Sequence, residues 1–174
     1  MTLLVTTSGV SLSLHLAVMD DLDAIVDLLE EAAAWLYARG IPHWPPGATR
    51  ADPSRIIQNI ERAEAYIAFA PQGPAATFAL QWADPELWGT RPPDAGYLHR
   101  LAVGRAVAGC GVGPALIRWA ETSAARRERA YLRLDCVAAN PAICRYYEIL
   151  GFEPRATVEL RQWRLQLFEK VIGP

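Results

Sequence analysis

The spacing of apolar residues changes several times along the chain, and each change predicts a new element. Apolar residues at alternate positions from Val10 to Leu16 predict a first strand with one buried face. From about residue 20 the spacing becomes helical, and the helix is expected to end at Gly40. Residues 1–9 precede this pattern and are expected to form a flexible tail.

The next part of the chain predicts a short helix and a hairpin. Asp52-Pro53 has the residue types of a helix cap and first turn, and isoleucines at helical spacing follow it. Two strand-like runs, residues 66–69 and 76–82, are separated by proline and glycine, which is typical of a hairpin turn. Residues 84–96 carry three prolines and two glycines and are expected to form a long surface loop.

The C-terminal half alternates strands and helices. A strand is expected over residues 97–103, a helix over about 114–129, a strand over 131–137 and a helix over 141–150, before a final pair of strands. These elements predict an α/β layered fold with a mixed sheet. Residues 10–174 are expected to form a single domain.

Composition narrows the class of protein. A formal charge of −2 over 174 residues does not favour binding to nucleic acid. The three cysteines form no Cys-x-x-Cys pair, so neither a metal site nor a disulfide framework is expected, and a reducing cytoplasm is the expected location. No segment has the run of about 18 apolar residues that a membrane span needs.

A glycine-dense turn offers a binding site for an anion. Residues 108–113 read Ala-Gly-Cys-Gly-Val-Gly and open the predicted helix, whose free N–H groups and positive dipole end suit a diphosphate. Cys110 stands where a P-loop would need lysine, and the third glycine of a dinucleotide fingerprint is replaced by Pro114 or Leu116. A different phosphorylated cofactor is therefore expected.

At these residues the chain resembles the GNAT superfamily of N-acetyltransferases. Gly111-Val112-Gly113 matches the end of the family's Arg/Gln-x-x-Gly-x-Gly/Ala loop, although Ala108 stands where the family has Arg or Gln. The segment Leu134–Phe152 resembles the family's strand, Asn-Pro helix start, tyrosine and closing Gly-Phe. The resemblance covers roughly residues 10 to 170.

The resemblance implies a mostly antiparallel sheet flanked by helices, with splayed strands at a site for acetyl-CoA. The acetyl group would pass to a primary amine by direct attack. The loop would bind the cofactor through backbone amides, so that Ala108 weakens this binding without abolishing it. The cofactor-binding residues implied are Leu101, Ala102, Val103, Ala108, Gly109, Cys110, Gly111, Val112, Gly113, Asn140 and Tyr147.

Two residues are candidates for the catalytic roles. Tyr147 occupies the family's position for the acid that protonates the departing thiolate, although its helical spacing also fits packing in the core. His99 is the candidate base, because most alkylamines are protonated at neutral pH and must lose a proton to react. A single histidine on a strand can equally serve a structural role.

The acceptor is left open. Trp44 and Trp88, with Asp84 and Glu86 nearby, are candidate walls for a cationic or aromatic amine, which could belong to a small molecule or a peptide. Pairing of two copies through the final strands is a further expectation from the resemblance. Two alternatives remain, namely a non-catalytic acyl-CoA-binding module and an α/β enzyme that binds a nucleotide at the glycine turn.

Overall fold

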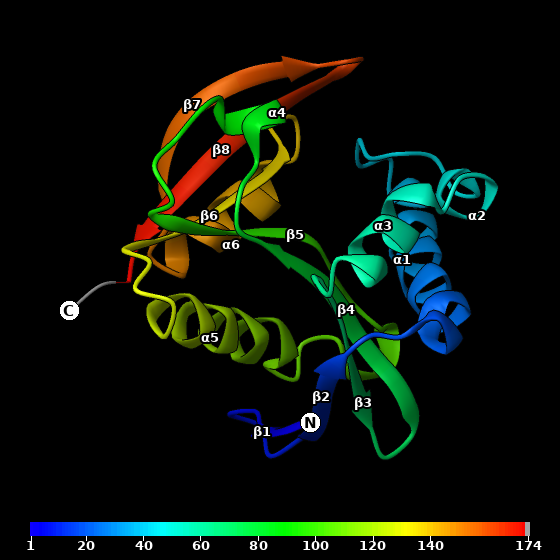
Figure 1. Ribbon diagram of the computed structural model, residues 1–174. Coiled ribbons are helices and arrows are strands. Elements are labelled where there is room, and N and C mark those ends of the chain that lie inside the picture. Colours follow the sequence, from blue (N-terminus) through cyan, green and yellow to red (C-terminus); the bar gives the residue numbers. More distant parts are fainter. Residues whose placement is uncertain (173–174) are drawn as a thin grey trace. The chain divides into compact units, whose positions relative to one another are not determined.

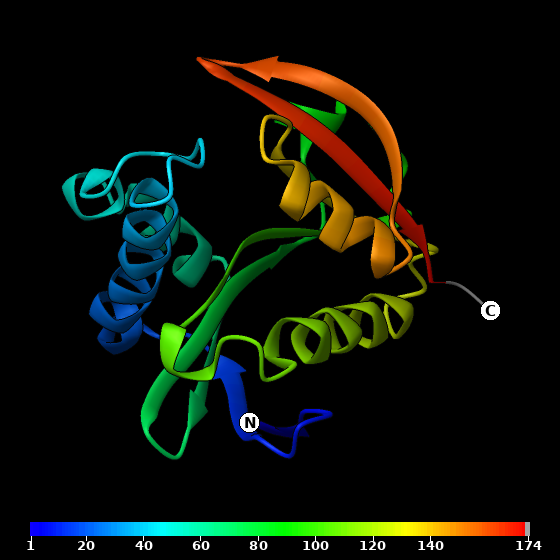
Figure 2. The same ribbon diagram turned by 180° about the vertical axis from the view of Figure 1, so that it is seen from behind.

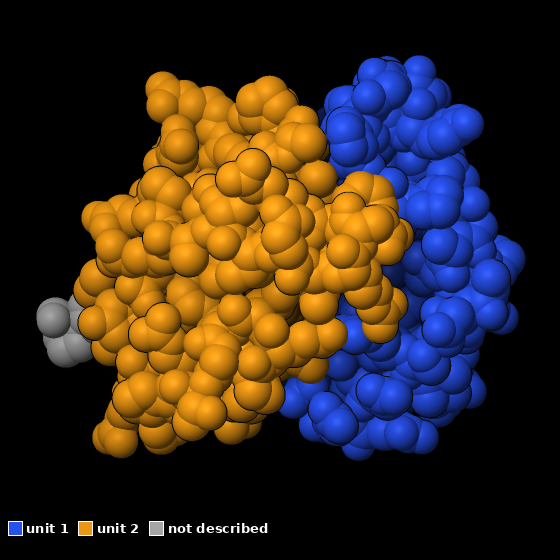
Figure 3. Space-filling view, turned by 90° about the horizontal axis from the view of Figure 1, so that it is seen from above, with its two compact units in different colours: residues 1–79, 100–116 blue, residues 80–99, 117–174 orange. Residues whose placement is uncertain are grey.

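In the computed structural model, which describes residues 1–172, the chain divides into two compact units (Figure 3). Unit 1 is built from Met1–Ala79 and Arg100–Leu116, and unit 2 from Leu80–His99 together with the chain from Ile117 onward. Neither unit is one continuous stretch of sequence. Each therefore depends on pairing between segments that are far apart along the chain.

The elements alternate much as the apolar spacing predicts. In chain order they are β1 (Thr2–Val5), β2 (Ser11–Leu16), η1 (Met19–Asp21), α1 (Leu22–Tyr37), α2 (Ala48–Ala51), α3 (Ser54–Glu61), β3 (Ala65–Ala70), β4 (Gly73–Gln81), α4 (Pro85–Trp88), β5 (Ala95–Val103), η2 (Arg105–Val107), α5 (Val112–Ala125), β6 (Tyr131–Val137), α6 (Pro141–Ile149), β7 (Glu153–Leu160) and β8 (Trp163–Val171).

The strands follow the hydrogen-bonded order β1-β2-β3-β4-β5-β6-β8-β7. The pairs β1–β2, β2–β3, β3–β4, β6–β8 and β8–β7 are antiparallel, whereas β5 and β6 pair in parallel. This mixed, mostly antiparallel sheet with flanking helices confirms the predicted fold class.

The core of unit 1 comes from two amphipathic helices and a strand. In α1 the buried side chains recur at helical spacing, and α3 adds Ile56 and Ile60 to the same cluster. Ile67 of β3 is fully enclosed by this cluster. Figure 1 shows α1 and α3 side by side. Burial of one apolar face on each element holds unit 1 together.

Unit 2 is organised around β6, which has a partner strand on each side. Its alternating residues Leu132 and Leu134 are buried, and Phe168 of β8 lies opposite Leu134. Figure 2 shows α6 alongside the long hairpin formed by β7 and β8. The helix that follows β6 thus packs against the hairpin that pairs with β6.

The N-terminal segment differs from the expected tail, because residues 2–5 form β1. This strand pairs with β2 from Thr2↔Leu14 to Val5↔Ser11. The turn between the two strands is closed by the Gly9 N–H, which donates to the Thr6 carbonyl. Its side chains are largely exposed, so backbone pairing and not burial holds it. Apolar spacing could not reveal a strand of this kind.

The predicted loop over residues 84–96 also differs, because it contains the helical turn α4. Asp84 caps this turn through Oδ1, which accepts the Leu87 N–H at 3.2 Å, and Pro85 occupies the first helical position. Trp88 ends the turn and is buried at 6% exposure. An Asp-Pro start followed by a buried tryptophan is a helix signal that the proline content of the segment masked.

A buried arginine ties several strands of unit 2 together. Arg133 is only 2% exposed, and its guanidinium donates to Asp94 Oδ1 at 2.8 Å, to Glu169 Oε2 at 2.7 Å and to the Tyr97 hydroxyl at 2.9 Å. The same group lies 5.1 Å from the ring centroid of Trp88. A buried charge is tolerated only when paired and hydrogen-bonded in this way.

Replacing Arg133 with methionine should therefore destabilise the protein by about 3 to 5 kcal/mol, because Asp94 and Glu169 would lose their buried partner. Urea unfolding measures this loss. The matched control is Arg164→Met, since Arg164 and Glu159 form an exposed ion pair at 3.7 Å that should contribute at most about 1 kcal/mol. Equal losses in the two variants would contradict this account of Arg133.

Candidate functional site

The register of the parallel pair β5–β6 sets which side chains meet in unit 2. The ladder runs from Ala95↔Tyr131 to Leu98↔Leu134, and it places Tyr97 opposite Arg133. Side chains of a strand return to the same face every second residue. His99 and Asp135 are the next same-face positions on their strands, so this register brings them together.

His99 lies between two carboxylates. Its Nδ1 is 3.2 Å from Asp135 Oδ1, and its Nε2 is 3.3 Å from Asp84 Oδ2. The side chains of His99, Asp84 and Asp135 expose only 14%, 8% and 15% of their surface. The contact between Nε2 and Oδ2 is an ion pair that does not have the geometry of a hydrogen bond. Within residues 1–172, neither of these two atoms has a hydrogen-bond partner.

These carboxylates change the charge of His99. Burial is the largest influence and disfavours the imidazolium, but contacts with Asp135 and Asp84 together outweigh it and raise the pKa of His99 from 6.5 to about 9. At pH 7 about one molecule in a hundred would then carry the neutral imidazole. The sequence predicts His99 as a base near neutral pH, whereas this environment makes it a base that works best in alkaline solution.

Tyr147 is held in an aromatic cluster on α6. Its ring lies 5.9 Å from Phe152 and 5.9 Å from Phe168, and 5.3 Å from the neighbouring Tyr146. Burial, with smaller contributions from charges that include Asp135, raises the pKa of Tyr147 well above its ordinary value. The phenol is therefore protonated at all physiological pH values, as a proton donor must be.

The start of α6 follows the predicted capping. Asn140 Oδ1 accepts the Ile143 N–H at 3.3 Å, and Pro141 occupies the first turn. The amide NH₂ group of Asn140 is not used by this cap. Asn140 can therefore cap the helix and still donate to a ligand, as the two predicted roles require.

The glycine turn forms in unit 1 with left-handed glycines. Gly109 and Gly111 have φ of 78° and 74°. At the start of α5 the Ala115 N–H donates to the Gly111 carbonyl. Val112 and Gly113 are the first two residues of α5, where N–H groups have no acceptor within the helix itself. Free amides at the start of a helix are a common binding site for anions.

The N-terminal turn supports the glycine turn. Ser8 Oγ donates to the Cys110 carbonyl at 2.5 Å, and a Cβ built on Gly111 would lie 2.8 Å from Thr7 Oγ1. Only glycine fits at position 111 without displacing Thr7. Residues 6–9 thus shape the glycine turn, a role that no local sequence pattern indicated.

The aromatic acceptor candidates occupy different environments. Trp44 belongs to unit 1 and is half-buried against His43, with ring centroids 4.2 Å apart. Trp88 belongs to unit 2, where it packs in a hydrophobic cluster with Tyr97. Glu86 is exposed on α4. Trp88 is therefore a core residue in this structure, which does not fit its predicted place in an acceptor wall.

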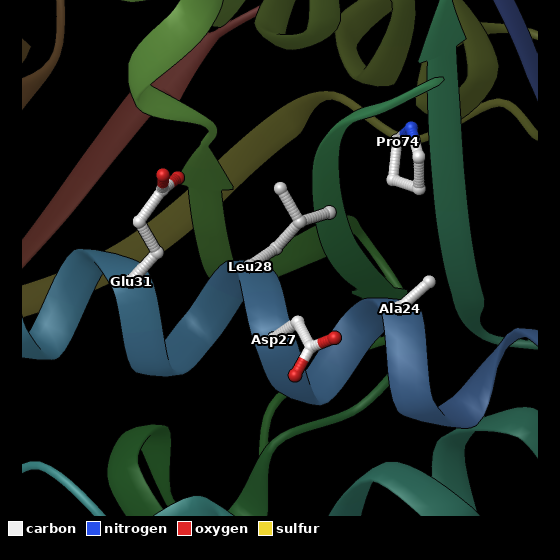
Figure 4. A pocket seen from close by; sticks show the side chains of 5 residues that line it. All are labelled: Ala24, Asp27, Leu28, Glu31 and Pro74. Atoms are coloured by element: carbon white, nitrogen blue, oxygen red, sulfur yellow. The ribbon is translucent and has the colours of Figure 1, made fainter.

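Unit 1 also contains a pocket of about 470 Å³ that none of the predicted site residues lines. Figure 4 shows its lining, with Asp27 and Glu31 on α1 and Pro74 on β4. Asp27 forms an ion pair with Arg50, and Glu31 accepts the Arg105 N–H at 2.8 Å. Both carboxylates are thus engaged by the protein itself.

Sequence reasoning missed both carboxylate partners of His99, although it placed Asp84 near the acceptor. Asp84 reaches His99 from α4, and Asp135 reaches it from β6. Asp135 could have been found, because the parallel order of the two strands places it beside His99 on one face. Asp84 had only its helix-capping signal, which does not reveal its partner.

The comparisons with known proteins identify the family. Residues 26–152 match the family described as "Acetyltransferase (GNAT) family". The chain is 36% identical over 143 residues to an uncharacterized N-acetyltransferase, YesJ, of Bacillus subtilis (strain 168), covering 79% of each chain. The protein belongs to the GNAT family of acetyltransferases.

Solved GNAT structures share the fold. An acetyltransferase of the GNAT family from Listeria monocytogenes 4b F2365 has a TM-score of 0.77 at 25% identity, covering 98% of this chain and 99% of that one. PaiA N-acetyltransferase from Thermoplasma acidophilum, solved with coenzyme A, has a TM-score of 0.71 at 16% identity, with coverages of 92% and 98%. Within the described residues, no helix is long and apolar enough to span a membrane.

The family match confirms the predicted family, the N-acetyltransferase class and, with them, the use of acetyl-CoA. A GNAT acetyltransferase moves an acetyl group to an amine of a small molecule or peptide.

Replacing Gly111 with alanine should destabilise the protein more than the same change at Gly109. Both positions have left-handed φ, which costs an L-residue about 1 to 2 kcal/mol. Only Gly111 adds the close contact with Thr7, whereas a Cβ at Gly109 meets nothing within 4 Å. Thermal unfolding of the two variants compares the losses, and Thr7→Ala should recover part of the Gly111→Ala loss. Equal losses of thermal stability in the two glycine variants would contradict the close contact between a side chain at position 111 and Thr7.

Proposed function

We propose that this GNAT protein transfers the acetyl group of acetyl-CoA directly to a primary amine, with Tyr147 as the acid and His99 as the base. One observation carries the assignment of roles. In unit 2 a phenol that stays protonated and an imidazole with a pKa of about 9 are both coupled electrostatically to the same carboxylate, Asp135. Above about pH 9 the phenol still carries its proton while the imidazole has lost its own, which is the pair of protonation states that the reaction needs.

The chemistry needs both groups. The amine nitrogen attacks the thioester carbon, the carbon–sulfur bond breaks, and the sulfur leaves as a thiolate. Tyr147 gives its proton to this thiolate, and His99 in its neutral form takes the proton that the nitrogen loses. Asp84 and Asp135 stabilise the imidazolium that results. No covalent enzyme intermediate is involved.

Coenzyme A would be bound by main-chain donors. The free N–H groups of Val112 and Gly113 and the positive end of α5 suit the diphosphate. The backbone of Leu101, Ala102 and Val103 would hold the pantetheine arm. Ala108 offers no side-chain donor, so the binding energy must come mainly from the amides.

The acceptor contacts, the location and the oligomeric state complete the proposal. Trp44 and Glu86 are proposed to contact the acceptor amine, while the buried position of Trp88 favours a packing role for that side chain. A cytoplasmic location is expected from the free thiols. A homodimer through the final strands is expected from the exposed β7 at one end of the strand order.

Replacing Tyr147 with phenylalanine should lower kcat by about 100-fold or more, because the thiolate would leave without a proton donor. The affinity for acetyl-CoA, measured by calorimetry, should change much less. Tyr146→Phe is the matched control, since Tyr146 directly precedes Tyr147 in α6 and is partly buried. Similar kcat values for the two variants would remove Tyr147 from the mechanism.

The rate should also report the ionisation of His99. Because His99 must be neutral to act as a base, kcat/KM should rise with pH up to about 9 and then level off. Asp135→Asn removes a charge that favours the imidazolium, so it should lower the pKa of His99. The rising limb of the pH–rate profile should then shift to a lower pH by about one unit or more. The assay uses an acceptor amine whose own pKa is well below that of His99.

Two outcomes would contradict this role. A limb that stays in place in Asp135→Asn would show that another group titrates. A limb that persists in His99→Ala would show the same, and would return His99 to a structural role.

A further inference from the structure

Two thiols that the mechanism does not use lie in contact beside Tyr147. Cys136 is on β6 and Cys144 is on α6, and their Sγ atoms are 3.6 Å apart. Both residues are half-buried, so small molecules can approach them. The third cysteine, Cys110, touches no other thiol within residues 1–172; its Sγ lies 3.9 Å from the Ala108 carbonyl.

The contact follows from the way the chain reverses after β6. The Asn140 N–H donates to the Val137 carbonyl at 3.0 Å, which closes a turn, and Asn140 then caps α6. The first turn of α6 thus returns over the end of the strand, and the Cys144 N–H bonds back to the Asn140 carbonyl at 3.3 Å. Local hydrogen bonds therefore hold the two sulfur atoms together.

We propose that Cys136 and Cys144 form a dithiol site that reacts with low-molecular-weight disulfides and closes into an internal disulfide. The bond length of a disulfide is about 2.05 Å, so the sulfur atoms must approach by about 1.5 Å from their separation of 3.6 Å. Small movements of α6 and of the two side chains supply this distance.

The reaction is a thiol–disulfide exchange that balances without any other reactant. The thiolate of one cysteine attacks a sulfur of the small disulfide and releases one molecule of thiol. The second cysteine loses its proton, attacks the mixed disulfide and releases the second thiol. The protein loses two protons and two electrons, which together are two hydrogen atoms, and the small disulfide gains them.

The order of attack follows from the surroundings of Cys136. Burial, and then the proximity of Cys144 and Asp135, raises the pKa of Cys136 well above its ordinary value. Because the thiolate is the attacking form, Cys144 attacks first and Cys136 resolves the mixed disulfide. The Cys144 sulfur therefore carries the small thiol in the intermediate.

Closure should slow acetyl transfer, a consequence that rests on the proposed role of Tyr147. Tyr147 is one helical turn after Cys144, and its ring is fitted between Phe152 and Phe168. Drawing α6 towards β6 would displace the phenol from the reacting sulfur. A displacement of about 1 Å can lower a rate by about 100-fold.

The test treats the reduced full-length protein with oxidised glutathione, blocks free thiols by alkylation and digests the protein with trypsin. Cleavage after Arg133 and after Arg145 releases one peptide that holds both cysteines. We expect this peptide to be lighter by two hydrogen atoms and to carry no alkyl group. Turnover should fall by about 10- to 100-fold in step with the cross-link and return on reduction.

The variants separate this site from the third cysteine. Cys110→Ser should still form the cross-link. Cys136→Ser should retain glutathione on Cys144, and Cys144→Ser should keep its turnover during the treatment. Absence of the cross-link in the wild-type peptide, or unchanged turnover in fully cross-linked protein, would overturn the proposal. A protein without acetyltransferase activity when reduced would instead refute the proposed function, and peptide mapping would still test the dithiol.

Discussion

The pairing of β5 with β6 is the constraint on which the chemistry of unit 2 depends. Its register puts Tyr97 opposite Arg133 and carries the same face forward to His99 and Asp135. A shift by one residue would turn every one of these side chains to the other face of the sheet. The structural charge cluster and the candidate base are therefore fixed by one strand pairing, and neither can move without the other.

The same face shows how burial and charge are balanced in two ways. Arg133 is surrounded by acceptors that satisfy it fully, so its charge serves stability. His99 has two carboxylates but only imperfect hydrogen bonds, so it keeps a proton that it can lose near pH 9. The difference lies in the pKa of the cation. A guanidinium cannot titrate in the range where an imidazole can.

The sequence predicted those parts of the fold and site that depend on local patterns. Strand β6, helix α6, its Asn140 cap and the glycine turn all follow from spacing and residue type within a few positions. Strand β1 was missed because backbone pairing holds it while its side chains stay exposed. The family resemblance placed Tyr147 where spacing alone could not decide between packing and catalysis.

Contacts between distant segments could not be predicted from local sequence patterns. The Asp84–His99 ion pair joins the cap of a helical turn to a strand, and the contact of Thr7 with the glycine turn spans most of the chain. The pair Cys136 and Cys144 is close in sequence, but its contact depends on the direction in which α6 leaves β6. Each contact changes the chemistry of a residue without leaving a periodic signal.

The most direct test of the account is the reaction of the purified protein with acetyl-CoA and a panel of amines that includes small amines, aminoglycosides, amino acids and peptides. Free thiol and acetylated amine are measured together, the latter by mass spectrometry. The account predicts that at least one amine gains an acetyl group in equal amount to the thiol released. Tight binding of acetyl-CoA with no acetylated amine across the panel would contradict it and would indicate a module that binds acyl-CoA without catalysis.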